Sequence, residues 1–139
     1  MKILVDTCIW STAFRKTIDK DSKNIVDELI ELINEGRIIM LGLIRQELLS
    51  GIRSEKQFKR LRDNLRAFED YPLVTEDYEM AAELFNKCRK KGIQGSNTDF
   101  LICAIAIRNN FSIFTADKDF KSFSEYIKIN LHKVRTHGR

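Results

Sequence analysis

The stretch from residue 96 to residue 120 constrains the fold of this chain more than any other part of its sequence. Ser96 and Asp99 fit the S/T-x-x-D/E pattern that begins a helix. Residues 100–107 are apolar on every side, which indicates a helix buried between other elements rather than one lying on a surface. A short apolar run over 111–115 then predicts a strand.

A buried helix followed by a strand is half of a β-α-β unit, so the chain is expected to contain a parallel sheet. The remaining apolar runs predict strands near residues 2–6, 37–42, 73–75 and 112–116, with a possible last strand over 126–131. Charged, helix-patterned segments separate them, for example 22–35 and 55–70. We therefore predict an α/β fold, a three-layer α/β/α sandwich around a parallel sheet of four to five strands. Its 139 residues, 43% of them hydrophobic, suit a single domain over 1–139.

Composition excludes several classes of protein. No apolar run reaches 18 residues and the N-terminal apolar stretch contains an acid, so neither a membrane span nor a signal peptide fits, and we expect a cytoplasmic protein. The three cysteines lack C-x-x-C spacing and are expected to be reduced thiols of the core. Both histidines, His132 and His137, fall in the last eight residues, which excludes an H-E-x-x-H zinc site and a Ser-His-Asp triad of ordinary spacing. Catalysis here has to rely on carboxylates.

Four acids are expected near one edge of the sheet. Asp6 and Asp117 follow strands, Asp99 lies in the first turn of the buried helix, and Glu47 lies on the helix after the second strand. Ligands of parallel sheets bind beyond the carboxyl ends of the strands. Taken singly, Asp6 could equally be a helix cap, and Glu47 fits a solvated helix glutamate more commonly than a ligand. Together, four negative charges require a cation, and oxygen-only ligands favour Mg²⁺ or Mn²⁺, ions that support phosphodiester cleavage by water.

The charge balance is compatible with a polyanionic substrate. The chain has 24 Lys and Arg against 20 Asp and Glu, a net charge of +4. Arg89, Lys90 and Lys91 end a predicted helix just before the Asp99 cap, which makes them candidate contacts for an RNA backbone. The same residues are equally explained as cations that stabilise the C-terminus of a helix through its dipole.

The four acidic motifs, VDTCIW, ELLSG, TDFLICAIA and TADKDF, resemble those of PIN-domain ribonucleases. The length and layout resemble the VapC-like toxins of toxin–antitoxin modules. The resemblance implies a Mg²⁺- or Mn²⁺-dependent endoribonuclease, a homodimer, and an antitoxin that covers the active site.

The resemblance also implies a role for each site residue. It makes Asp6, Asp99 and Asp117 the main metal ligands, while Glu47 holds a metal or orients water. Two hydroxyls, those of Thr115 and Thr7, are the candidates for a hydrogen bond within the acidic cluster. Asp119 is either an outer acid or a ligand for a second ion, and the motif leaves open whether it coordinates metal together with Asp117.

Two other classes of function compete with this prediction. One is a PIN-like module that binds RNA or protein without cutting, against which the four intact acids argue. The other is a phosphate-handling α/β domain. A haloacid-dehalogenase-type phosphatase requires D-x-D after the first strand, where this chain has Asp6-Thr7-Cys8, and a receiver domain requires paired acids at that strand.

Overall fold

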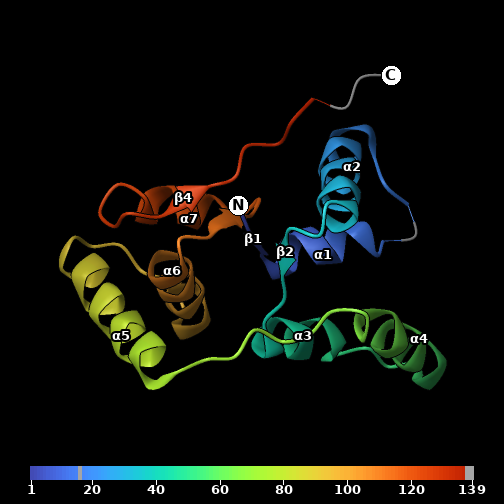
Figure 1. Ribbon diagram of the computed structural model, residues 1–139, viewed down its shortest axis with the longest axis horizontal. Coiled ribbons are helices and arrows are strands. Elements are labelled where there is room, and N and C mark those ends of the chain that lie inside the picture. The colour runs from blue at the N-terminus through green and yellow to red at the C-terminus, as the bar shows by residue number, and fades with distance from the viewer. Residues whose placement is uncertain (16, 137–139) are drawn as a thin grey trace.

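The computed structural model describes residues 1–15 and 17–136, which form four strands and seven helices (Figure 1). In chain order these are β1 (Ile3–Val5), α1 (Thr7–Ala13), α2 (Lys20–Asn34), β2 (Ile38–Ile39), α3 (Gly42–Leu49), α4 (Glu55–Leu65), α5 (Thr75–Lys90), α6 (Asn97–Asn109), β3 (Ser112–Phe114), α7 (Lys118–Phe123) and β4 (Asn130–Leu131).

The four strands form one parallel sheet in the order β2-β1-β3-β4. All residues of the central strands β1 and β3 are buried, as expected for parallel strands covered on both faces. Val5 lies beside Phe114 in register, and the Asp6 amide donates to the Phe114 carbonyl at 2.9 Å. The residues that follow the two strands therefore leave the sheet at the same edge.

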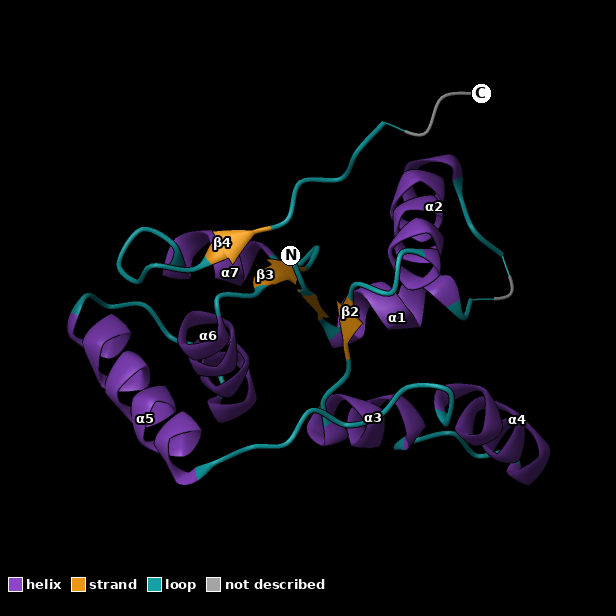
Figure 2. Ribbon diagram, in the orientation of Figure 1, coloured by secondary structure: helices purple, strands orange, loops and turns teal. Residues whose placement is uncertain are grey.

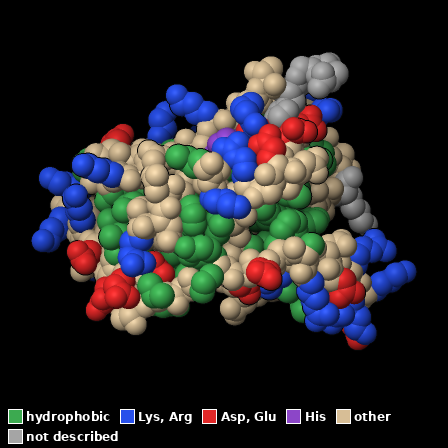
Figure 3. Space-filling model, viewed as in Figure 1, with side chains coloured by type: hydrophobic (Ala, Val, Ile, Leu, Met, Phe, Trp, Pro, Cys, Tyr) green, Lys and Arg blue, Asp and Glu red, His purple; other side chains and the backbone are tan. Residues whose placement is uncertain are grey.

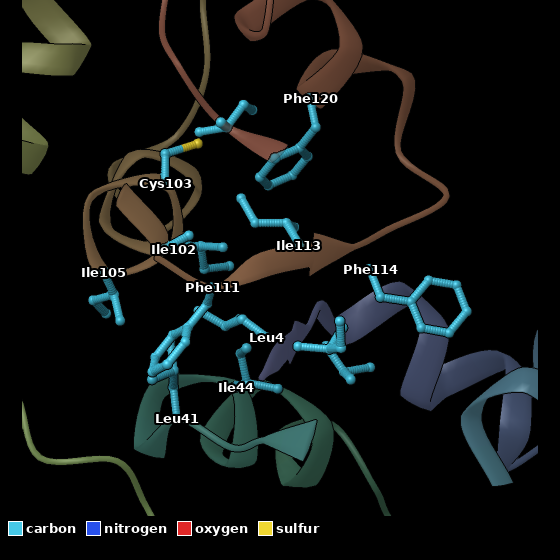
Figure 4. Packing of buried hydrophobic residues seen from close by; sticks show 14 of the residues in the cluster. Leu4, Leu41, Ile44, Ile102, Cys103, Ile105, Phe111, Ile113, Phe114 and Phe120 are labelled. Atoms are coloured by element: carbon cyan, nitrogen blue, oxygen red, sulfur yellow. The ribbon is translucent and has the colours of Figure 1, made fainter. Parts of the chain in front are cut away.

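Helices cover both faces of the sheet. Figure 2 shows α5 and α6 on one side, α1 and α2 on the other, and α3 with α4 near the β2 edge. In the close view of the core, Ile102 and Cys103 of α6 lie against Ile113 of β3 (Figure 4). Each of these three side chains is fully buried. The α/β class and the parallel sheet predicted from the sequence are confirmed.

The predicted strand at residues 73–75 is wrong. Pro72 has no amide to donate to a sheet, and the Val74 amide instead donates to the Asp77 carboxylate at 2.9 Å, which begins α5. In the described part of the chain, this region instead forms an isolated parallel bridge, between Asp70 and Met40, which follows β2. The fourth strand of the sheet is β4, which occupies two residues of the segment 126–131, where the sequence predicts a possible last strand.

Candidate metal centre

Asp6 is held at the carboxyl end of β1 by three donors. Its Oδ1 accepts from the Thr7 amide at 2.8 Å, which makes it the N-cap of α1. Its Oδ2 accepts from the Thr115 hydroxyl at 2.8 Å and from the Cys8 thiol at 3.3 Å. Only 7% of Asp6 is exposed, so these bonds fix the direction of a largely buried carboxylate.

Thr115 connects Asp6 to the acidic segment after β3. Its hydroxyl donates to Asp6 and accepts from the Asp117 amide at 3.0 Å. Asp117 in turn caps α7, accepting from the Asp119 amide at 2.9 Å. Asp119 lies in the exposed first turn of α7. One hydroxyl thus joins the ends of the two central strands.

Glu47 reaches the same region from α3. The Thr7 hydroxyl donates to Glu47 Oε1 at 2.7 Å, and Thr7 is the residue directly after Asp6. Because Glu47 is exposed, this bond, rather than burial, holds its side chain beside the start of α1.

Asp99 forms a reciprocal cap with Ser96 at the start of α6. The Ser96 amide donates to Asp99 Oδ2 at 3.2 Å, and the Asp99 amide donates to Ser96 Oγ at 3.0 Å. Burial raises the pKa of Asp99, and the negative charges of Asp117 and Asp6 raise it further, against the lowering effect of the Ser96 bonds. Asp99 therefore lies within electrostatic range of both other aspartates.

An aromatic cluster fastens α6 to α7. The rings of Phe100 and Phe123 lie 4.7 Å apart, and Phe120 contacts Phe123 at 5.3 Å between ring centroids. Gly95 allows this approach, since a Cβ at that position would lie 2.5 Å from the Phe123 ring. Phe100 directly follows Asp99, and Phe123 belongs to the helix that Asp117 caps, so the cluster sets how far apart these two acids lie.

Among residues 1–15 and 17–136, no three Asp, Glu, His or Cys side chains are placed close enough together to hold a metal ion. Asp6, Asp99 and Asp117 each accept a hydrogen bond from a backbone amide at a helix start. The donor set nevertheless fits a hard divalent cation, because it consists of carboxylate oxygens whose mutual repulsion a cation relieves.

Cys8 is the site residue that sequence reasoning missed. The sequence predicts a core thiol, as Cys88 and Cys103 are, but Cys8 is only partly buried and its thiol donates to Asp6. Its sulfur also accepts from the Ala116 amide at 3.4 Å. Burial raises the pKa of the Cys8 thiol, so it acts as a neutral donor to Asp6. The sequence does contain one indication of this contact, since Cys8 lies only two residues after Asp6.

The basic segment Arg89-Lys90-Lys91 is exposed at the C-terminal end of α5. Figure 3 shows Lys and Arg side chains gathered at the edge of the molecule where α5 ends. Arg89 also lines a small cavity of about 160 Å³ together with Gly95 and Phe100, which places the segment beside the start of α6. Contact with RNA stays a prediction for all three residues.

Comparisons with known proteins agree with this architecture. The family model described as "PIN domain" matches residues 3–126. The fold is similar to that of FitAcB from Neisseria gonorrhoeae, with a TM-score of 0.76 and 19% identity over 94% of this chain and 96% of the other. VapBC2 from Rickettsia felis, bound to a DNA fragment from its promoter, is similar with a TM-score of 0.75 and 22% identity over 95% of this chain and 98% of the other. VapBC-5 of Mycobacterium tuberculosis, from the VapBC family of toxin–antitoxin systems, is similar with a TM-score of 0.67 and 18% identity over 96% of this chain and 100% of the other.

A search of curated proteins found no match. In the described part of the chain, none of the helices has the length and apolar character needed to cross a membrane.

Proposed function

The chain belongs to the PIN-domain family, and on that premise we propose that it is a Mg²⁺- or Mn²⁺-dependent endoribonuclease, the toxin of a toxin–antitoxin module. The observation that supports the proposal is that Asp6 and Asp117 follow the neighbouring strands β1 and β3, which end at the same edge of the sheet. The Thr115 hydroxyl donates to the Asp6 carboxylate and accepts from the backbone amide of Asp117. The negative charges of Asp117 and Asp6 contribute to the raised pKa of Asp99, and the Thr7 hydroxyl donates to Glu47.

Asp6, Asp99 and Asp117 are the proposed metal ligands, with Glu47 beside them and Asp119 as a further acid at the rim. When bound, a divalent ion of this kind supplies a more acidic water and neutralises charge on a phosphate oxygen. The cation would also favour the ionised form of Asp99, opposing the effect of burial on its pKa.

The side chains around the acids have positioning roles in this proposal. Thr115 and Cys8 donate to Asp6 Oδ2 and so limit how its carboxylate turns. Thr7 donates to Oε1 of Glu47 and so restrains the carboxylate that is proposed to hold a metal or orient water. Arg89, Lys90 and Lys91 would contact the phosphates of the RNA.

The proposed partners are a cognate antitoxin, which occupies the acidic site and blocks it, and a second copy of the chain. The titles of the similar structures name toxin–antitoxin systems for those proteins, and the fold they share with this chain supports the proposal. A small reading frame directly upstream of the gene would be the expected source of the antitoxin.

Cleavage of total cellular RNA by the purified chain tests the activity. With Mg²⁺ or Mn²⁺ we expect discrete products that disappear in EDTA. Asp99→Asn should give none, although asparagine also caps helices and should preserve the start of α6. Intact RNA in every lane, from a protein shown to bind the metal, would contradict the nuclease proposal and favour a module that only binds.

A further inference from the structure

The chain after β4, residues 132–135, runs from the sheet to α2 (Figure 1). The His132 amide still belongs to the sheet, because it donates to the Ile113 carbonyl of β3 at 2.7 Å. Arg135, three residues later, donates to the Glu28 carboxylate of α2. We call residues 132–135 the C-terminal clasp, since they fasten α2 to the sheet.

Glu28 is the acid at the centre of the clasp, and it is completely buried. Its Oε2 lies 2.5 Å from Nε2 of His132 and accepts from the Arg135 amide at 3.3 Å. The Nε group of Arg135 donates to both oxygens of Glu28 at 3.1 Å, and its Nη1 donates to Glu35 at 2.9 Å. A buried carboxylate is costly unless it is paired and hydrogen-bonded, so the folded chain has to keep these donors in place around Glu28.

His132 carries this restraint to the end of β3. Its ring lies in a T-shaped arrangement against the Phe114 ring, with 5.3 Å between the ring centroids. Side chains alternate along a strand, and Figure 4 shows Phe114 on the α1 side of β3, opposite Ile113. Phe114 is only 1% exposed, so the imidazole is part of the wall that fixes this side chain.

Phe114 is connected directly to the acidic site. Its carbonyl accepts from the Asp6 amide at 2.9 Å. The next residue, Thr115, supplies the hydroxyl that donates to Asp6 and accepts from the Asp117 amide. The sulfur of Cys8 lies 3.5 Å from the same hydroxyl. A shift of the chain at Phe114 would therefore displace these groups together.

We propose that Glu28 and His132 are positioning residues for the acidic site, acting from α2 and the C-terminal clasp. Glu28 fixes the imidazole of His132, and the imidazole supports the Phe114 ring. Phe114 in turn sets the direction in which Thr115 leaves the sheet. The consequence for metal binding rests on the proposed function, whereas the ordering of residues 114–117 does not.

Alkylation of the cysteines tests this ordering without any metal. The folded chain is treated with iodoacetamide in EDTA, and the modification of each cysteine is followed by mass spectrometry. The rate for Cys103, which is fully buried and reports global unfolding, is subtracted from the rate for Cys8. The remainder measures local opening at the end of β3. It should rise in His132→Ala, and by less in Arg135→Ala, which keeps the imidazole.

Asp77→Asn is the matched control for a loss of stability alone. Asp77 is also a buried carboxylate paired with an arginine, and its partner Arg108 lies in the last turn of α6, at the opposite end of that helix from Asp99. This variant should be less stable than the wild-type chain, yet the local opening at Cys8 should not change. Thermal melting verifies that each protein is folded, which is expected of Arg135→Ala because 42% of that side chain is exposed.

Titration of Mn²⁺ measures the consequence for the acidic site. His132→Ala should raise the Kd for Mn²⁺ about 2- to 30-fold, the range typical of residues that influence a site without contacting its ligand. Asp77→Asn should leave this Kd unchanged.

Faster local opening at Cys8 and weaker Mn²⁺ binding in His132→Ala, with neither effect in Asp77→Asn, support the inference. Unchanged opening in both clasp variants, an equal rise in Asp77→Asn, or a Kd for Mn²⁺ that His132→Ala leaves at the wild-type value overturns it. If the wild-type chain bound no Mn²⁺ while Cys8 opened faster only in the clasp variants, the proposed metal site would be refuted and the ordering of residues 114–117 by the clasp would stand.

Discussion

Replacing Thr115 with valine tests the hydrogen-bond network of the acidic site most sharply. Valine keeps the shape of threonine but cannot donate to Asp6 Oδ2, at 2.8 Å in the structure, or accept from the Asp117 amide. A hydrogen bond to a charged group contributes about 1.5–3 kcal/mol to stability. Losing the hydrogen bond from the Asp117 amide should change the free energy of unfolding little, because Asp117 is exposed and water can replace the Thr115 hydroxyl as acceptor.

We therefore expect Thr115→Val to lower the free energy of unfolding by about 1.5–3 kcal/mol, which for a chain of this length lowers Tm by roughly 5–10 °C. The apparent affinity for Mn²⁺ should fall by about 10- to 100-fold, as is typical when a residue that orients a metal ligand is lost. Chemical denaturation and isothermal titration measure the two effects.

Thr115→Ser is the matched control, since serine keeps the hydroxyl and removes only a methyl group. It should bind Mn²⁺ like the wild-type chain. If Thr115→Val bound Mn²⁺ as tightly as Thr115→Ser, the hydroxyl would have no part in positioning Asp6 and the proposed network would be refuted.

Three further effects follow from the same site. The pKa of Asp99 is raised above its ordinary value of 3.8, so ionisation of Asp99 destabilises the fold at pH values above 3.8 and has no such effect below it. Asp99→Asn, measured in EDTA, should therefore gain stability relative to the wild-type chain as pH rises from about 4 to 7. An equal pH dependence of the two proteins would contradict this. Mn²⁺ at about 100 times its Kd should stabilise the wild-type chain by about 2.7 kcal/mol in denaturant titrations but fail to stabilise Asp99→Asn to that extent. Gly95→Ala should lower the free energy of unfolding by about 1–3 kcal/mol, because its Cβ would overlap the Phe123 ring, and should reduce RNA cleavage. Gly36→Ala is the control: a Cβ there meets no other atom, but φ is +67°, so the variant should lose stability without losing specific activity.

The shared sheet edge at which Asp6 and Asp117 follow β1 and β3 could be predicted, because it depends on local patterns and on one general rule. Short apolar runs ending in Asp6 and Asp117, and the Ser96–Asp99 pattern before an apolar helix, are visible in the sequence. Since parallel strands end at one edge, their acids were expected there, and the β1–β3 register bears out that geometry for the strand ends.

Other features depend on contacts between distant residues and could not be read from local patterns. The cluster of Phe100, Phe120 and Phe123 joins two helices, one of which, α7, was not predicted at all. Asp117 was interpreted as the end of a strand, although it is also an N-cap, a role for which aspartate is well suited. Leu73 and Val74 have strand-like character, but the proline before them and the Asp77 cap after them override it.

The central claim is that acids from separate elements act as one site for a hard cation. The most direct test is isothermal titration of Mn²⁺ into the wild-type chain and four single variants, Asp6→Asn, Glu47→Gln, Asp99→Asn and Asp117→Asn. The account predicts saturable binding to the wild-type chain that is weakened at least about tenfold by each of the three aspartate substitutions, with a smaller effect of Glu47→Gln. Binding that none of the substitutions alters, or no binding of Mn²⁺ to the wild-type chain, would contradict it.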